Sequence, residues 1–239
     1  MCTQTDERPP VARIGVLQLA RALFSLAILV SSPFLAAGRL DWLPAWALVA
    51  LTLTANAISR IIPARRHPDL LVERARFVEG RDVKPWDRLL MPIVGIIGPL
   101  ATWIVAGLDE RFVWLPVVPL ALQIAAFLVV AAGSALATWA MAENRFFSAV
   151  VRIQRDRGHS VVSTGPYRFV RHPGYAGGVL AAIGMPLALG SAWALIPGVL
   201  SAGAIAARTA LEDRTLHEEL DGYREYAARV RYRLLPGVW

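Results

Sequence analysis

The sequence has a single cysteine, Cys2, and therefore offers no disulfide framework and no cysteine-based metal site. Charge is also sparse, because only 18% of the residues are Asp, Glu, Lys or Arg. Hydrophobic residues make up 56% of the chain and the mean hydropathy is +0.47. This composition argues against an ordinary soluble domain and favours an integral membrane protein.

Lysine is nearly absent as well, since Lys84 is the one lysine among the 25 basic residues. The net charge of +7 would suit a nucleic-acid partner in a soluble protein. Here the arginines lie between long apolar runs, so membrane topology explains them better. We therefore predict no nucleic-acid partner.

Four apolar runs are long enough to cross a bilayer, which takes about 20 helical residues. They are Ile14–Ala37, Trp42–Ile62, Leu89–Leu108 and Val113–Ala142. A last run, Ala176–Ala207, is too long for one pass, and its Gly and Pro residues predict two short helices that turn near Gly190-Ser191. We expect an all-α membrane bundle over residues 1–239, with four spanning helices, a C-terminal helical hairpin and a cytoplasmic C-terminal helix.

Arginine placement predicts the orientation of this bundle. Basic residues crowd the loop at 63–88, the segment at 144–175 and the tail, whereas only Arg39 and Arg111 fall in the opposite connections. The positive-inside rule then places both termini, the loop and the segment in the cytoplasm. We divide the chain into N-terminal spanning helices, 1–142, and a ligand-binding region, 143–239.

A polar, turn-rich stretch, STGPYRFVRHPGYAGG (Ser163–Gly178), stands at the edge of the last apolar run. Proline favours extended geometry in the residue before it and suits the first turn of a helix, so Pro173 predicts a helix start just after Arg171 and His172. A helix N-terminus beside an arginine is a typical carboxylate or phosphate site. The alternative is that these side chains only anchor the helix to lipid headgroups.

The C-terminal tail adds a carboxylate. Apolar residues recur there at three- and four-residue steps, which predicts one amphipathic helix with Glu212 on its apolar face and Asp213 off it. A carboxylate on an apolar face needs a cationic partner. Two interpretations stay open: Glu212 forms a salt bridge with Arg171 or Arg208, or it faces the Arg171 site and holds a cationic ligand.

Short motifs follow one another in the C-terminal part: Gly158-His159, Gly165-Pro166-Tyr167, Arg171-His172-Pro173-x-Tyr175, Glu212-Asp213 and Tyr223-x-x-Tyr226. This series resembles the isoprenylcysteine carboxyl methyltransferase family of membrane enzymes, although Asp213 stands where the family usually has a second glutamate. The resemblance implies S-adenosyl-L-methionine as the cofactor. The absence of a glycine-rich dinucleotide fingerprint after a predicted strand agrees with this.

The resemblance also implies a cofactor site at the cytoplasmic membrane surface, with a lipophilic small-molecule or lipidated acceptor arriving from the lipid bilayer. The expected cofactor-binding residues are His159, Val161, Val162, Gly165, Tyr167, Arg171, His172, Pro173, Tyr175, Glu212, Tyr223 and Tyr226. Arg171, Glu212 and His172 are the expected catalytic residues, and no metal is expected. A bacterial inner membrane is the expected location, and the oligomeric state stays open.

The sequence leaves the reacting group of the acceptor open. A carboxylate needs no base, whereas a thiol or amine would use His172, His159 or Glu212. The competing functions are a membrane reductase of the sterol-reductase type that uses NADPH, and a non-catalytic membrane scaffold. Glycines at 174, 177, 178 and 184 indicate either lateral access of the acceptor beside the hairpin or close helix packing.

Overall fold

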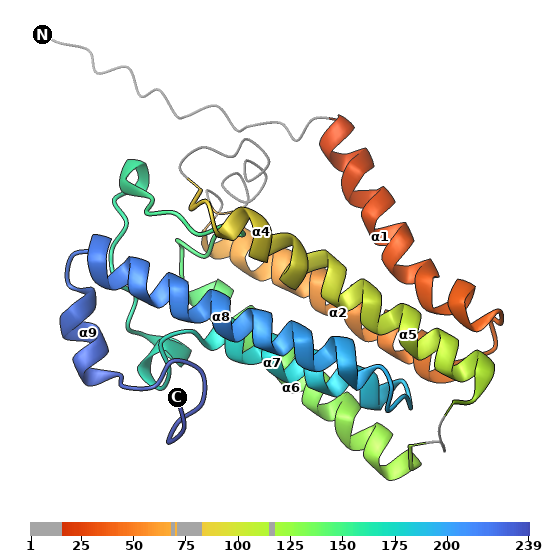
Figure 1. Cartoon of the computed structure of the whole chain (residues 1–239). Coiled ribbons are helices and arrows are strands. Elements are labelled where there is room, and N and C mark those ends of the chain that lie inside the picture. The colour runs from red at the N-terminus through yellow and green to blue at the C-terminus, as the bar shows by residue number, and fades with distance from the viewer. Residues whose placement is uncertain (1–15, 68–69, 71–82, 115–117) are drawn as a thin grey trace, which may run out of the picture.

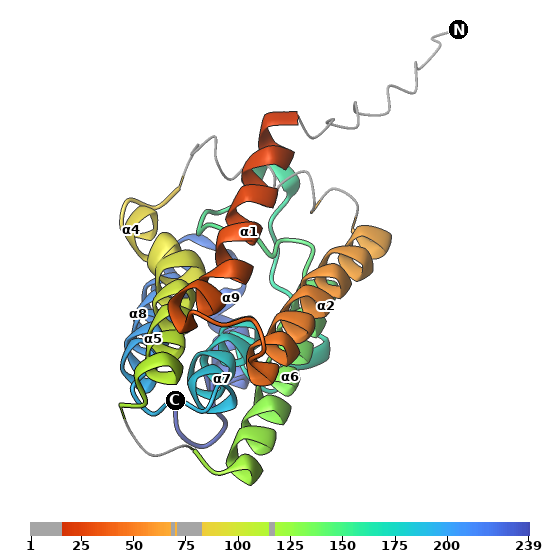
Figure 2. The same ribbon diagram turned by 90° about the vertical axis from the view of Figure 1, so that its right-hand side faces the viewer.

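A computed structural model describes residues 16–67, 70, 83–114 and 118–239, and over these residues the chain is all-helical, as predicted. The long helices are α1 (Val16–Ala37), α2 (Leu43–Arg66), α5 (Gly98–Phe112), α6 (Leu120–Glu143), α7 (Pro173–Ala188) and α8 (Leu195–Glu219). They run roughly along one direction, with α1 inclined beside α5 (Figure 1). Seen from one end of the bundle, α7 lies centrally between α8 and α6 (Figure 2).

Among the described residues, four stretches are long and apolar enough to cross a membrane: Leu43–Pro63, Asp87–Phe112, Leu120–Glu143 and Leu195–Glu219. Three of them match predicted runs. The fourth, in α8, was expected to be a short hairpin helix and is 25 residues long, because the helix continues past Ala207 through a charged stretch. Residues 14 and 15 of the first predicted span, Ile14–Ala37, lie outside the described residues, and within α1 the stretch Phe24–Ala37 is an apolar helix shorter than the four spans.

The turn between α7 and α8 lies at Gly190-Ser191, as the sequence predicted. Gly190 has φ +79°, in the left-handed region that favours glycine. The Ser191 hydroxyl donates to Asp109 Oδ2 at 2.6 Å, which fastens the turn to the end of α5. The hairpin is therefore tied to a spanning helix at its tip.

Glycines bring α7 close to α6. A Cβ at Gly177 would lie 2.3 Å from the Gly133 carbonyl oxygen, and a Cβ at Gly184 would lie 2.8 Å from a methyl carbon of Val130. Such contacts leave no room for a side chain. A Cβ at Gly178 would meet only ordinary contact, 3.4 Å from an α8 side chain. Of the two roles predicted for the glycines, the geometry of Gly177 and Gly184 favours helix packing.

The span Asp87–Phe112 contains a π-helical turn. Helix α4 (Asp87–Pro92) leads into η2 (Ile93–Ile97), which continues as α5. Pro99 has no N–H for the Gly95 carbonyl, its partner in a regular α-helix. The Gly98 N–H bonds the Ile93 carbonyl, the wider closure of a π-turn. The proline thus explains why the helix widens near Gly95.

The helix ends gather at two ends of the bundle. At the pocket end, so named for the cavity described below, Lys84 pairs with Glu219 at 2.5 Å. At the opposite end Arg39 pairs with Glu110 at 3.0 Å. The connection expected at 63–88 is shorter, because α2 continues to Arg66, and its residues 68–69 and 71–82 lie outside the described residues.

The tail is not the single amphipathic helix that the periodicity predicted. Helix α8 ends at Glu219, Gly222 adopts φ +78°, and the short helix α9 (Tyr223–Arg229) follows in a new direction. The left-handed glycine permits this break. The tail therefore folds back on the pocket end.

Candidate active site

A cavity of about 290 Å³ opens at the pocket end, near the lower limit of about 300–1,000 Å³ for small-molecule sites. Its walls come from α4 and η2, the segment 144–162, the start of α7, the end of α8, and α9. Ten of the twelve predicted cofactor-binding residues line it: His159, Val161, Val162, Tyr167, Arg171, His172, Tyr175, Glu212, Tyr223 and Tyr226. Their grouping at one cavity agrees with the sequence analysis, and their roles stay predictions.

Gly165 and Pro173 do not line the cavity and instead shape its surroundings. Gly165 has φ +55°, and a Cβ there would lie 2.9 Å from the carboxylate carbon of Glu143. It opens the short 3-10 helix η4 (Gly165–Arg168), which carries Tyr167. Pro173 is the first residue of α7, where the sequence predicted a helix start.

Glu212 faces the cavity from α8. Its Oε2 accepts a hydrogen bond of 2.5 Å from the Tyr175 hydroxyl. Neither salt bridge predicted for Glu212 forms, because Arg171 pairs with Asp213 and Arg208 pairs with Asp87. Within the described part of the chain, no basic nitrogen lies within 4.0 Å of the Glu212 carboxylate. A half-buried carboxylate of this kind attracts a cationic group.

Asp213, the next residue, is the centre of a cluster with Arg171, His172, Tyr223 and Arg233, here called the Asp213 cluster. Its Oδ1 accepts from Arg171 Nε and the Tyr223 hydroxyl, each at 2.8 Å, and lies 3.1 Å from His172 Nε2. Its Oδ2 accepts from Arg171 Nη2 at 3.0 Å and from Arg233 Nε at 2.8 Å. The carboxylate is thus bound from both sides.

Although the sequence places Asp213 off the apolar face of the helix, its side chain is only 1% exposed. The spacing of apolar residues in a sequence predicts only which face of that one helix is apolar, and does not predict what covers the other face. The other face of α8 is covered by the returning C-terminal segment and by Tyr223 from α9. Arg233, which closes this cover, was not predicted as a site residue, and only its place in an arginine-rich tail could have suggested it.

Arg171 is largely occupied by the protein itself. Its Nη1 donates to the carbonyls of Val230 and Arg231 at 2.9 and 2.8 Å, and its Nε and Nη2 donate to Asp213. Four of the five N–H groups of the guanidinium therefore have partners. Arg171 holds the C-terminal segment against the start of α7, and within the described residues at most one N–H remains for a ligand.

A second buried ion pair, absent from the predicted site, supports the cavity from the side of the spanning helices. Arg208 donates to Asp87 through Nε at 2.6 Å and Nη2 at 3.0 Å, and Asp87 is fully buried. Arg208 also lies over the Tyr175 ring, 5.4 Å from its centroid. A charged side chain at the end of an apolar run needs a partner of opposite charge. The positions of Asp87 and Arg208 at the ends of two such runs could therefore have suggested that they form a pair.

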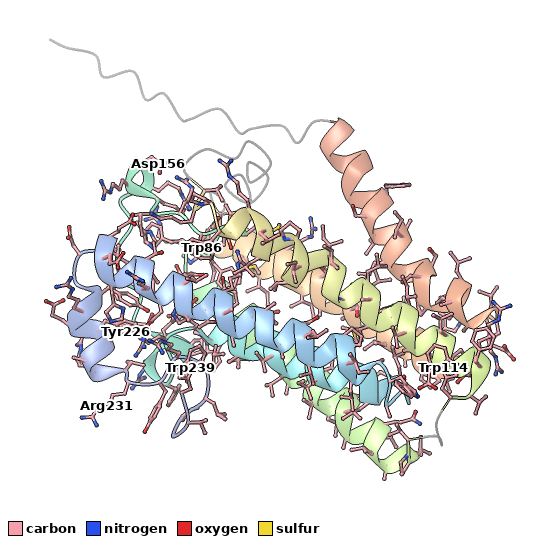
Figure 3. The ribbon with its side chains drawn as sticks, viewed as in Figure 1. Trp86, Trp114, Asp156, Tyr226, Arg231 and Trp239 are labelled. Atoms are coloured by element: carbon pink, nitrogen blue, oxygen red, sulfur yellow. The ribbon has the colours of Figure 1, made fainter. Side chains whose placement is uncertain are left out.

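The tyrosine hydroxyls on the α9 side are used internally. Tyr226 donates to the Tyr167 carbonyl at 2.8 Å, and Asn144 Nδ2 donates to the Tyr167 hydroxyl at 3.2 Å. Burial raises the pKa of both phenols above their usual range, so they stay neutral. Tyr226 lies at the pocket end on the side of Arg231 and Trp239 (Figure 3). These tyrosines bring aromatic rings to the cavity wall.

His159 offers a neutral imidazole. The Gln154 backbone N–H donates to His159 Nδ1 at 3.3 Å, which leaves the proton on Nε2. Burial, together with the charges of Arg157 and Arg152, lowers the pKa of His159 to about 4. The ring packs on Phe146 with centroids 4.5 Å apart. His159 can therefore donate a hydrogen bond at neutral pH.

Comparison with known protein families gives one match. Residues 124–219 match the model of the isoprenylcysteine carboxyl methyltransferase (ICMT) family, and a search of curated proteins found no match. The matched region spans most of α6, all of α7 and α8, and the cavity-lining segment between α6 and α7, while α9 and the C-terminal segment lie outside it. The family resemblance is confirmed over residues 124–219, and this match supports a membrane methyltransferase in general.

Proposed function

We propose that this protein transfers a methyl group from S-adenosyl-L-methionine to a lipophilic acceptor. The observation that carries the proposal is the Glu212 carboxylate, which lines the cavity with no basic nitrogen within 4.0 Å among the described residues. The cofactor has an ammonium and a sulfonium, and a half-buried carboxylate suits either cation. Glu212 lies within the residues that match the ICMT family model.

The other residues of the cavity fit the remaining groups of the cofactor, which would supply an activated methyl group on its sulfonium. Tyr175, Tyr223 and Tyr226 bring aromatic rings, which attract a cation by about 0.5–2 kcal/mol. His159 Nε2–H and the backbone of Val161 suit the adenine and ribose. The carboxylate of the cofactor would meet the first-turn N–H groups of α7, where an α-helix leaves its N–H groups without partners.

The acceptor would reach the cavity from the bilayer at the π-turn. Met91, Val94 and Gly95 line the cavity and belong to the span Asp87–Phe112. Gly95 is also exposed at the surface of the bundle, and a Cβ there would meet nothing within 4 Å. An apolar wall that reaches the surface at a residue without a side chain favours access at Gly95, and not beside the hairpin glycines.

The chain would contribute position and charge to the transfer, in which the acceptor–methyl bond forms as the sulfur–methyl bond breaks. A carboxylate acceptor is already a nucleophile, so orientation and exclusion of water suffice. Arg208 lines the cavity one helical turn before Glu212 and carries the charge to orient such a carboxylate. A thiol or amine acceptor would need a base, for which His172 and Glu212 are the candidates, because the Nδ1 lone pair of His159 already accepts from the Gln154 N–H.

A ligand titration tests the proposal directly. Purified protein in detergent is titrated by calorimetry with S-adenosyl-L-methionine and, separately, with NADPH. We expect saturable binding of the first and none of the second. Binding of NADPH alone would favour the reductase, and binding of the methyl donor without turnover of any lipophilic acceptor would favour a scaffold.

We also propose that the pocket end faces the cytoplasm of a bacterial inner membrane, because basic residues are concentrated there. In a Cys2→Ser background, a cysteine at Asp41, exposed at the opposite end, should react with an impermeant reagent added outside cells. A cysteine at Asp221, exposed at the pocket end, should react only after the membrane is opened. The reverse pattern would overturn the orientation.

A further inference from the structure

The C-terminal segment, residues 230–239, returns from α9 toward the spanning helices (Figure 1). Two backbone hydrogen bonds fix its course: Arg171 N–H donates to the Tyr232 carbonyl and His172 N–H to the Arg233 carbonyl, both at 2.9 Å. Helix α7 begins at the next residue, Pro173, and is apolar over its whole length. The segment therefore lies level with the point where an apolar helix begins.

The end of this segment closes on itself and leaves its apolar side chains uncovered. A main-chain oxygen of Trp239 accepts from the N–H groups of Arg233, Leu234 and Leu235 at 2.9, 3.0 and 3.2 Å, and Gly237 turns the chain with φ +82°. The backbone is thus bonded within the loop. The side chains of Leu235 and Val238 are 57% and 73% exposed.

Exposed arginines flank the loop. Arg229 and Arg231 are exposed, and the Arg231 side chain projects away from the molecule (Figure 3). Arg233 instead turns inward, donating to Asp213 and stacking over the Trp239 ring at 5.0 Å. Apolar side chains bordered by arginines suit the boundary of an anionic bilayer. There the apolar side chains contact acyl chains and the arginines contact headgroup phosphates.

We propose that residues 231–239 form an interfacial anchor, which inserts Leu235 and Val238 into the leaflet at the pocket end while Arg229 and Arg231 bind anionic headgroups. The same segment supplies Arg233 to the Asp213 cluster and receives the Arg171 side chain. Contact with lipid therefore steadies the cavity wall. The anchor does not depend on which cofactor the cavity binds.

Nitroxide labels at single cysteines test the anchor. In the Cys2→Ser protein, Val238→Cys and Leu235→Cys are labelled, with Asp221→Cys as the control because it is exposed in the turn between α8 and α9. In vesicles of phosphatidylcholine and phosphatidylglycerol, labels at 235 and 238 should be relaxed by oxygen and shielded from a water-soluble nickel chelate. The label at 221 should show the reverse. Nickel accessibility at 235 and 238 equal to that at 221 would overturn the proposal.

A comparison of anionic and neutral vesicles tests whether Arg229 and Arg231 bind anionic headgroups. The combined change Arg229→Gln and Arg231→Gln should reduce the shielding of the label at 238 in anionic vesicles, and should leave it unchanged in pure phosphatidylcholine. Equal shielding with and without these arginines would refute their binding to anionic headgroups. Labelled protein without S-adenosyl-L-methionine gives these readings, so a failure of the proposed methyl transfer would not affect them.

Discussion

Asp213 and Glu212 are neighbours on α8, yet the protein surrounds them in opposite ways. The carboxylate of Asp213 is 1% exposed and is bound by two arginines, a histidine and a tyrosine. The carboxylate of Glu212 faces the cavity and, among the residues that the structure describes, accepts one hydrogen bond, from Tyr175. A carboxylate whose acceptor sites are filled can hold a fold together, whereas one that is mostly unfilled can bind a ligand. The comparison separates the structural acid from the binding acid.

The largest effect should follow from breaking the Asp213 cluster. Asp213→Ala leaves the Arg171 and Arg233 guanidiniums without their carboxylate, and removing one partner of a buried ion pair costs about 3–5 kcal/mol. We expect a loss of that order in the free energy of unfolding, measured in detergent. Glu212→Ala should change it by less than about 1 kcal/mol. Equal losses of unfolding free energy in both variants would contradict the assignment of Asp213 as the structural acid and Glu212 as the binding acid.

Arg171→Ala sharpens the same comparison. Because four of its N–H groups bind protein atoms, its removal should lower the stability, as Asp213→Ala does. Any weakening of cofactor binding should follow from that loss. If Arg171→Ala weakens binding while the free energy of unfolding stays near wild type, the remaining N–H contacts the ligand and the role predicted from the sequence is right.

The next effect concerns binding. Glu212→Gln keeps the shape of the side chain and removes its charge, so S-adenosyl-L-methionine should bind more weakly by about 1.5–3 kcal/mol, the value of a charged hydrogen bond. Calorimetric titration measures the change. Arg66→Gln is the matched control, because the Arg66 side chain is 58% exposed and its ion pair within the described part of the chain, with Glu143, is long at 3.9 Å. Equal weakening in both variants would indicate a general loss of structure.

Substitutions at two glycines distinguish the role of glycine in helix packing from its role in access of the acceptor to the cavity. Gly177→Leu would overpack the contact with α6 and should cost about 1–3 kcal/mol of stability. Gly95→Leu meets open space, so stability should hold while turnover of a long apolar acceptor falls, on the order of tenfold. Unchanged turnover in Gly95→Leu, assayed with a long and a short acceptor, would exclude access at the π-turn.

The sequence predicted what depends on run length and local chemistry. The all-helical fold, the turn at Gly190-Ser191 and the helix start at Pro173 are all confirmed, because hydrophobic length, glycine and proline act locally. Ten of the twelve cofactor-binding residues named from the sequence line one cavity, whereas Gly165 and Pro173 do not, and the roles of all twelve stay predictions.

What the sequence did not predict depends on contacts between distant segments. The burial of Asp213 needs the C-terminal segment to return to Arg171, and the Asp87–Arg208 pair joins residues that are 121 positions apart. Helical periodicity within one segment predicts neither the contact of the C-terminal segment with Arg171 nor the pairing of Asp87 with Arg208. The break at Gly222 was missed for a related reason, since the apolar spacing continues across it while the backbone turns.

The smallest effect is a pH dependence at His159. Burial holds its folded-state pKa at about 4, below the ordinary value of 6.5, so the unfolded chain binds more protons between these values. The stability that this neutral imidazole contributes is present above pH 6.5 and is lost as the pH falls toward 4. The slope of the unfolding free energy against pH cannot exceed about 1.4 kcal/mol per pH unit for one proton.

The free energy of unfolding, measured from pH 4 to pH 7, should therefore lose part of its pH dependence in His159→Gln, whose amide can still donate. His67→Gln, which lies outside the cavity, serves as the control. If the two variants have the same pH profile, His159 is not held neutral by its surroundings, and its assignment as a hydrogen-bond donor to the ligand loses its basis.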